Sequence, residues 1–303
     1  MDIDDLIPLA ERHALLANEN WRCASLINEK RSYDVPGLLV IRKTCPSAFE
    51  ASIYSPVFCL VLQGAKETSV GNQSASVAAG EMLLVSHELP VETRVTHASP
   101  VSPYLAVFVS IDVGLARSLL DQAGPNGMGA GNGRSLDTAV ADAPLIEALA
   151  RYLLLPANSL EAEIIAPMIQ REIHFRLLMA PVGAMLRNLL SPGGHASRVA
   201  KAIKTIRENF RESLALSVLA NSVGMSQSSF HSNFKSVTGT TPLQYQKDLR
   251  LISARQLLAE GTHSVTSAAL AVGYESISQF SREYSRKFGA SPRNDLVSDA
   301  GLA

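Results

Sequence analysis

The feature of the sequence that most restricts the possible folds is an internal repeat in its C-terminal third. The segment SVGMSQSSFHSNFKSVTGTTP, which begins at Ser222, aligns with AVGYESISQFSREYSRKFGASP, which begins at Ala271, at an offset of about 50 residues. The aligned pairs are Phe230 with Phe280, Phe234 with Tyr284, Gly239 with Gly289, and Pro242 with Pro292. A repeat of this length predicts one supersecondary unit that occurs twice.

Each copy has the pattern of two helices joined by a short turn. In the first copy, Gly224 ends the first helix and Ser226 is the expected N-cap of the second. A small residue four positions before the turn glycine, Ala220 in one copy and Ala269 in the other, lets two helices cross closely. We therefore predict two helix-turn-helix units. The apolar face of the first helix consists of Leu216, Leu219, Ala220 and Val223.

The second helix of each copy carries polar side chains on the face opposite its aromatic residues. In copy one these are Gln227, Ser228, His231, Ser232 and Lys235; in copy two they are Ser276, Ser278, Gln279, Arg282, Arg286 and Lys287. Glutamine can pair with adenine and arginine with guanine in the major groove, whereas Lys235, Arg286 and Lys287 suit phosphates. Arg282 is the strongest candidate for reading a base. For any single position, a solvated helix face is an equally good interpretation.

The net charge of the chain also differs between the part that contains the repeat and the part before it. Residues 1–195 contain 14 Lys and Arg and 20 Asp and Glu, a net charge of −6, whereas residues 196–303 contain 13 and 8, a net charge of +5. A basic module joined to an acidic one is typical of a phosphate-binding domain carried on a separate sensory domain.

The first half of the chain predicts β-structure followed by helices. From Leu38 to Ile111, six or more short strand-like segments are separated by turn residues, which predicts a sandwich or barrel. Residues 113–124 and 142–190 have helical spacing, with breaks expected at Pro156 and Pro181. The segment PNGMGAGNG between them lacks phosphate-loop spacing and is expected to be a connector. The helical block can pack on the barrel or form a dimer seam, and we favour some part in dimerisation.

Residues from about 199 to 294 resemble the AraC/XylS family of bacterial transcription regulators. The resemblance rests on Phe234-Lys235, Gly239 with Pro242, Arg250-Leu251 with Ala254 and Leu257-Leu258, and Gly273-Tyr274 through Pro292. Ser232 stands where an arginine is common in the family, so the first unit is expected to contact phosphates more than bases. The segments LVLQGAKETSVGN, GEMLLVSHELPVETRV and SPYLAVFVSID look like the cupin-like N-terminal domain of one branch of the family.

The resemblance implies an α+β fold of two domains. A cupin-like β-barrel with a helical extension, for effector binding and dimerisation, is expected over 1–190, a linker over 191–197, and an all-α module of two helix-turn-helix units joined by a linker helix over 198–296. The implied function is a cytoplasmic, sequence-specific regulator of transcription, an activator in our prediction, whose small-molecule effector binds in the barrel. The implied partners are double-stranded promoter DNA, RNA polymerase and a second copy of the chain.

Other chemistries lack support in the sequence. There is no GxSxG, no Walker sequence and no convincing carboxylate pair, so we expect no enzyme and no cofactor. His87 and His97 have no HxH spacing and are expected to be capped-turn or surface histidines rather than metal ligands. Cys23, Cys45 and Cys59 form no CxxC pair; small buried side chains are the expected role of each, and redox or electrophile sensing is the alternative. The acidic start of the chain and the absence of a long apolar segment argue against export and a membrane span.

The identity of the effector stays open at this level. The basic residues Arg22, Lys30, Arg31, Arg42 and Lys43 are candidates for an anionic ligand such as a cyclic dinucleotide, although solvated charge explains them equally simply. An apolar ligand or a reactive aldehyde inside the barrel is also compatible. The alternative function is a cupin-type ligand-binding protein or enzyme whose helical half serves oligomerisation.

Overall fold

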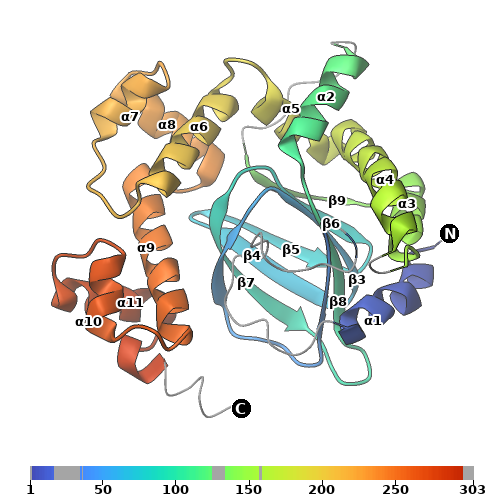
Figure 1. Cartoon of the computed structure of the whole chain (residues 1–303), viewed down its shortest axis with the longest axis horizontal. Coiled ribbons are helices and arrows are strands. Elements are labelled where there is room, and N and C mark those ends of the chain that lie inside the picture. Colours follow the sequence, from blue (N-terminus) through green and yellow to red (C-terminus); the bar gives the residue numbers. More distant parts are fainter. Residues whose placement is uncertain (1, 17–34, 36, 125–133, 157–158, 296–303) are drawn as a thin grey trace.

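The computed structural model describes residues 2–16, 35, 37–124, 134–156 and 159–295. A β-barrel with helices on one side forms the first part of the chain, and a separate set of helices forms the second (Figure 1). The nine strands are β1 (Leu38–Lys43), β2 (Glu50–Tyr54), β3 (Val57–Gln63), β4 (Ala65–Val70), β5 (Gln73–Ala78), β6 (Glu81–Val85), β7 (Leu89–His97), β8 (Tyr104–Ser110) and β9 (Leu136–Val140).

The barrel is built from two antiparallel sheets. The five-stranded sheet has the order β1-β8-β3-β6-β9, and the four-stranded sheet has the order β2-β7-β4-β5. The first half was therefore predicted correctly as a small all-β unit, but the sequence interpretation missed β9, which pairs with the edge of β6. Only five residues long and half-buried for much of its length, β9 lacks a strong alternation of apolar and polar side chains.

The central strands β8, β3 and β6 of the five-stranded sheet are buried on both faces. In β3, Cys59 and Val61 face the barrel interior, whereas Phe58 and Leu60 pack against the helices outside. This explains why β3 reads as a continuous apolar run rather than an alternating strand. The helices on that outer face are α1 (Ile7–Leu16), α2 (Val113–Ala123), α3 (Ala143–Leu153), α4 (Leu160–Met179) and α5 (Ala184–Leu190), with short 3₁₀ turns η1 (Ile3–Leu6) and η2 (Pro181–Gly183).

These helices confirm the helical patterns of the sequence. The helix predicted to end at Gly124 is α2, and α3, α4 and α5 occupy the block over 142–190 with its breaks near Pro156 and Pro181. The glycine-rich connector lies outside the described residues. Among the helices that the structure describes, none combines the length and the apolar character needed to cross a membrane.

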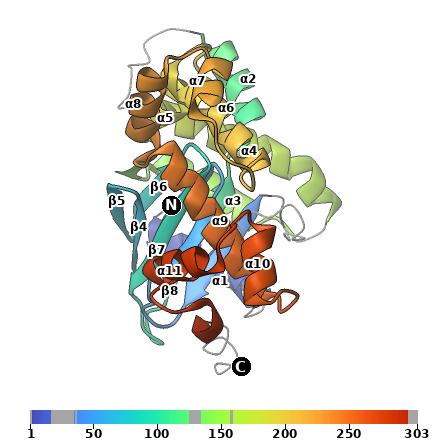
Figure 2. The same cartoon turned by 90° about the vertical axis from the view of Figure 1, so that its left-hand side faces the viewer.

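The second part of the chain is all helical. It consists of α6 (His195–Glu208), α7 (Leu216–Ser222), α8 (Gln227–Thr238), α9 (Pro242–Ala259), α10 (Val265–Ala271) and α11 (Ile277–Phe288). Figure 2 shows α9 running across the front of the barrel, with α7 and α8 at one end and α10 and α11 at the other. Helices α10 and α11 pack with α9 in a core of their own. The buried side chains of α7 and α8 instead join the cluster of buried residues inside the barrel.

The segment that connects the two parts of the chain is short. Helix α5 ends at Leu190 and α6 begins at His195, with a turn that contains Gly193 in the left-handed region. The assignment of 191–197 as a linker between domains stays a prediction, because the two parts share buried contacts on either side of it.

Candidate nucleic-acid interface

The two repeats fold into two helix pairs with the same turn. In the first pair the Met225 N–H donates to Ala220 O, and in the second the Tyr274 N–H donates to Ala269 O, both at 3.0 Å. At Gly273 the backbone φ is +88°, and a Cβ there would lie 2.1 Å from Arg211 O. Only glycine fits this position, which is why the turn signal is readable from the sequence.

The second helix of each pair is capped and anchored in the same way. Ser226 accepts a hydrogen bond from the Ser229 N–H, which confirms the predicted cap, and Ser276 accepts one from the Gln279 N–H. The aromatic faces are buried, and their rings pack edge to face or tilted at centroid distances of 4.5–5.6 Å. The opposite face of α8 and of α11 is thereby held outward in a fixed orientation.

Most of the predicted DNA-contacting side chains lie on these outward faces. The exposed ones are Gln227, Ser228, His231, Ser232 and Lys235 on α8, and Ser278, Gln279, Arg282 and Arg286 on α11. Ser276 is half-buried, and its hydroxyl serves as the N-cap of α11. Lys287 is also half-buried, with its side chain 12% exposed. The roles of all eleven residues toward DNA stay predictions.

Helix α9 sets the distance between the two units. Its 18 residues span about 27 Å at the rise of an α-helix, which is shorter than the roughly 34–36 Å of one helical turn of B-DNA. Both units pack against it, one near each end (Figure 1). The helices α8 and α11 are thus attached near opposite ends of one helix.

The structure adds a residue that sequence reasoning saw only as part of a family motif. The Arg250 guanidinium, on α9, donates to the carbonyl oxygens of Phe210, Arg211, Glu212 and Gly273 at 2.6–3.0 Å. It thereby joins the loop after α6 to the turn of the second helix pair. Because arginine has five donors in a planar fork, one side chain can orient both units relative to α9.

The C-terminal end of α8 is fastened to the barrel, which the sequence did not predict. The Asn72 N–H, in the β4–β5 hairpin, donates to Gly239 O at 3.2 Å, and Ser135 Oγ donates to Val237 O at 2.6 Å. A Cβ at Gly71 would lie 2.2 Å from Gly239 O, so only glycine allows this approach. The hairpin and α8 line a groove of about 930 Å³, whose charged side chains in the described part of the chain, Arg134 and Lys235, are both basic.

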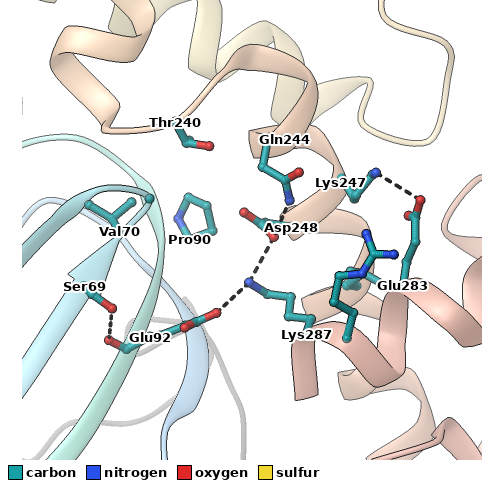
Figure 3. Close-up of a pocket in the computed structure, with 13 residues that line it drawn as sticks. Ser69, Val70, Pro90, Glu92, Thr240, Gln244, Lys247, Asp248, Glu283 and Lys287 are labelled. Carbon is teal, nitrogen blue, oxygen red and sulfur yellow. Dashed lines mark hydrogen bonds and ion pairs between the residues drawn. The ribbon is translucent and has the colours of Figure 1, made fainter. Parts of the chain in front are cut away.

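A second contact joins α11 and α9 to the barrel. A cleft of about 300 Å³ lies between β4, β7 and the two helices, and Figure 3 shows the residues that line it. Lys287 Nζ lies 3.1 Å from Glu92 Oε1 on β7 and 3.0 Å from Asp248 Oδ1 on α9. The predicted phosphate-binding lysine is therefore engaged in ion pairs across the two parts of the chain in this arrangement.

Glu283 lines the same cleft and is held as a carboxylate. Lys247 lies 3.0 Å from its Oε1, and the Tyr274 hydroxyl donates to its Oε2 at 2.8 Å. Burial opposes its ionisation, but the hydrogen bonds from Lys247, Tyr274 and Gln279 outweigh burial and lower the pKa of the Glu283 carboxyl. The end of α11 that faces the barrel thus carries a network of paired charges (Figure 3).

His87 corrects one expectation from the sequence. It is 3% exposed, between the barrel and α6, rather than on the surface. One ring nitrogen lies 2.9 Å from Ser86 Oγ and the other 3.1 Å from Ala196 O. Burial lowers the pKa of the His87 imidazole to about 4, so the ring is neutral at pH 7. No local pattern predicts this burial, because Ala196 is distant from His87 along the chain.

The other predicted sites have simple surroundings. His97 is exposed, and no three His, Cys, Asp or Glu side chains in the described part of the chain gather as a metal site would require. Cys59 is buried as expected, but Cys45 is exposed in the loop after β1, which corrects the expectation for that residue. Cys23 lies outside the described residues.

Two of the five basic effector candidates lie in the described part of the chain. Arg42 lies 3.9 Å from Glu11, and Lys43 lies 2.8 Å from Glu50, so both basic side chains of β1 have acidic neighbours. Arg22, Lys30 and Arg31 lie outside the described residues. The role of this basic group toward an anionic ligand stays a prediction.

Comparison with known proteins gives two family matches. The model of the AraC-type transcriptional regulator N-terminus matches residues 34–185, which is half of the chain, and a helix-turn-helix domain model matches residues 219–296. The first match covers the barrel and most of its helices. The second covers both helix pairs except the start of α7.

Curated relatives and solved structures agree with these matches. The chain is 34% identical to the HTH-type transcriptional activator RhaS of Escherichia fergusonii over 125 residues, 41% of this chain and 44% of that protein. It is 32% identical to RhaS of Salmonella schwarzengrund over 139 residues, 45% of this chain and 48% of that protein. The matched segment thus spans about half the length of these curated relatives.

Two structures of ToxT from Vibrio cholerae share the fold of the whole chain. An apo variant superposes with a TM-score of 0.56 at 12% identity, covering 86% of this chain and 97% of that one. The wild-type protein bound to an unsaturated fatty acid has a TM-score of 0.56 at 11% identity, covering 86% and 93%. These likenesses show a common arrangement of a β-domain followed by a helical helix-turn-helix module.

Proposed function

This chain belongs to the family of AraC-type transcriptional regulators, and on that premise we propose that it binds promoter DNA sequence-specifically through α8 and α11. The observation that carries the proposal is the pair of capped helices that expose short polar and basic side chains, joined by the 18-residue helix α9. Exposed side chains of α11, above all Arg282, read base edges, and Lys235 and Arg286 contact phosphates.

The barrel controls this activity through a small-molecule effector. The fastening of α8 to the β4–β5 hairpin and of Lys287 to Glu92 supports a coupling between the barrel and the DNA-contacting helices. An effector that binds the barrel more tightly in one arrangement shifts the population toward that arrangement. The ToxT structure with a bound unsaturated fatty acid supports effector binding in a protein of this fold.

The regulator acts in the cytoplasm as an activator, with RNA polymerase as its protein partner. The name of the RhaS relatives, transcriptional activators, supports this direction of control. Because the family consists of transcription regulators, which are not enzymes, the alternative of a cupin-type enzyme has no separate observation in its favour.

The chain also forms a homodimer, for which the outer face of α4 is the candidate seam. Large apolar side chains, 43–71% exposed, follow one face of this helix: Leu160, Ile164, Met168, Phe175 and Met179. Glu161 and Glu163 stand in its first turn, and Arg176, which pairs with Glu172, stands in its last turn. An antiparallel pair of α4 helices would therefore bury the apolar stripe and bring opposite charges together.

The test of DNA binding uses the full chain, because the first helix pair shares its core with the barrel. Fluorescence anisotropy measures affinity for the upstream region of the gene's own locus and for a shuffled duplex, at two salt concentrations. We expect selective binding that weakens as salt rises. Arg282→Ala is expected to cost about 1–3 kcal/mol on the specific duplex and to relax preference at one base pair.

Lys204→Ala is the matched control, because it removes one positive charge from α6, where the side chain is 78% exposed, without touching either recognition helix. It should change affinity little. Equal loss for every sequence with Arg282→Ala would reject base reading by Arg282. No binding to any duplex would reject the proposed function.

A further inference from the structure

The interior of the barrel contains a lysine where the fold calls for an apolar side chain. Burial alternates along β4, so that Lys66, Thr68 and Val70 face inward and the residues between them are half-buried. Lys66 is only 3% exposed. Lysine is almost never buried to this degree without a partner, because the ammonium loses its hydration.

Within the part of the chain that the structure describes, the polar neighbours of the Lys66 ammonium are the Cys59 thiol and the Tyr54 phenol, and no carboxylate pairs with it. Among the described residues, its Nζ has no hydrogen-bond partner. It lies 4.6 Å from the ring centroid of Phe108 and 5.5 Å from that of Tyr54, and these ring faces attract the cation only weakly. Burial raises the pKa of the Cys59 thiol and of the Tyr54 phenol, so both groups are neutral at pH 7 and neither is a counter-ion.

A second polar group lines the same cavity and also lacks a partner. Tyr104, on β8, is 2% exposed, and its hydroxyl makes no hydrogen bond to any described residue. Strands β4 and β8 belong to opposite sheets, so the amine and the hydroxyl reach the cavity from its two sides. Two unpartnered buried donors at one cavity call for an acceptor that neither sheet supplies.

The cavity is small and opens at one end. Its volume is about 20 Å³, which has room for about one water-sized group. Toward the surface it is lined by Lys43, Glu50 and Arg94. Lys43 pairs with Glu50 at 2.8 Å, and Arg94 pairs with Glu67 at 2.7 Å. Of the charged side chains that line the cavity in the described structure, Lys66 is thus the one without an opposite charge.

We propose that this cavity binds the carboxylate group of a small organic acid, with Lys66 as its counter-ion and the Tyr104 hydroxyl as a donor to one oxygen. A carboxylate matches the site because it brings one negative charge and an acceptor oxygen that can enter the cavity, while its second oxygen stays toward the mouth. The rest of the ligand points to the mouth beside Glu50 and Arg94. The proposal rests on the proposed function in one respect, that this acid is the effector.

The cleft between the barrel and the helical module is less suited to such a ligand. Its lysines already have acidic partners: Lys247 pairs with Glu283, and Lys287 with Glu92 and Asp248. An acid entering there would compete with carboxylates of the protein. An acid that enters the barrel interior would not compete with a carboxylate already paired with Lys66.

Titration calorimetry and thermal unfolding of the full chain test the site, with sodium formate and sodium acetate as probes. Acetamide is the neutral counterpart of acetate, and sodium chloride at equal ionic strength is the reference. We expect formate and acetate to bind and to raise the unfolding temperature, with no effect of acetamide. Lys66→Met should weaken binding at least about tenfold, because it removes the charge while keeping a chain that fits the cavity.

Two further variants make the result decisive. Lys204→Met removes the same charge from the exposed face of α6, away from the cavity, and should keep binding within about twofold of wild type. Tyr104→Phe keeps the ring and removes only the hydroxyl, and should weaken binding by a smaller factor than Lys66→Met; it serves as the test should Lys66→Met not fold. Equal effects of acetate and acetamide, an equal effect of chloride, or unchanged binding by Lys66→Met or Tyr104→Phe would overturn the proposal.

DNA affinity measured with and without formate separates this site from the proposed function. Formate should change promoter affinity in wild type and not in Lys66→Met. If formate binds through Lys66 but no duplex is bound, the regulator function fails and the site stands. If DNA is bound selectively but no carboxylate is bound, the site fails and the regulator function stands.

Discussion

Among single residues, His87 and Arg250 do the most to place the helical module. Arg250 ties four backbone carbonyls together, so it orients the two helix pairs without any role in reading DNA. His87 lies at the contact of the barrel with α6, where Ser86 and Ala196 occupy both of its ring nitrogens. Because burial favours the neutral ring, protonation of His87 would weaken this contact.

The pH dependence follows from the lowered pKa of His87. The unfolded chain protonates this ring as the pH falls below about 6.5, whereas the folded protein resists protonation until the pH approaches about 4. The stability that the neutral ring contributes is therefore complete above pH 6.5 and decreases toward pH 4. Between pH 7 and pH 5 the loss amounts to up to about 2 kcal/mol.

Chemical denaturation at pH 7 and pH 5 measures this effect. We expect the loss of stability between the two pH values to be smaller in His87→Gln than in wild type. His97→Gln is the control, because His97 is exposed, and it should keep the wild-type loss. An equal loss in His87→Gln and wild type would contradict the assignment.

At the scale of elements, α4 illustrates how one helix serves two environments. Its inner face packs in the core outside the five-stranded sheet, and its outer face carries the apolar stripe defined above. The helix is therefore apolar almost all round, which is typical of a helix covered on both sides. The exposed apolar stripe supports the dimer seam directly. The sequence analysis favoured dimerisation only from the helical block over 142–190.

The dimer is tested by the double variant Ile164→Glu, Met168→Glu. Two like charges on each stripe would meet their copies across an antiparallel seam, so we expect a monomer where the wild type sediments as a dimer. Sedimentation velocity over a range of concentrations measures this. Val101→Glu places the same charge at a side chain that is 95% exposed and outside α4, and should leave the dimer intact. A monomeric wild type, or a dimeric double variant, would rule out the α4 seam.

At the scale of the whole molecule, the barrel contacts both recognition helices. Its β4–β5 hairpin contacts the end of α8, and β7 contacts α11 through Glu92 and Lys287. DNA that binds α8 and α11 on the side that faces the barrel would compete with these contacts. The arrangement therefore links DNA affinity to the strength of docking between the two parts.

Glu92→Lys tests this link. The substitution replaces attraction by repulsion at Lys287, so it should loosen docking and free a phosphate-binding lysine. We expect promoter affinity to rise by about two- to fivefold, with a steeper salt dependence, in fluorescence anisotropy. Glu67→Lys makes the same charge change at a residue paired with Arg94 within the barrel. If Glu67→Lys raises affinity as much as Glu92→Lys does, net charge rather than docking is responsible.

Much of the helical module was predictable because its signals are local. The turn glycines, the serine caps and the buried aromatic residues each depend on neighbours within a few positions, so Gly224, Ser226 and Phe230 have the same meaning in the sequence and in the structure. The alternation of strands and the helical spacing after Ile111 are local signals of the same kind. The strand β9 escaped because it is short and pairs only at an edge.

By itself, the sequence determined the two kinds of fold, their order, and the faces of α8 and α11 that point outward. Tertiary structure alone decided that Lys287 meets Glu92, that His87 is buried against α6, and that Lys66 finds no hydrogen-bond partner inside the barrel among the residues that the structure describes. The reason is physical. Periodicity and capping depend on hydrogen bonds and packing between near neighbours, whereas burial and charge pairing depend on which distant segments the closed barrel and docked helices bring together.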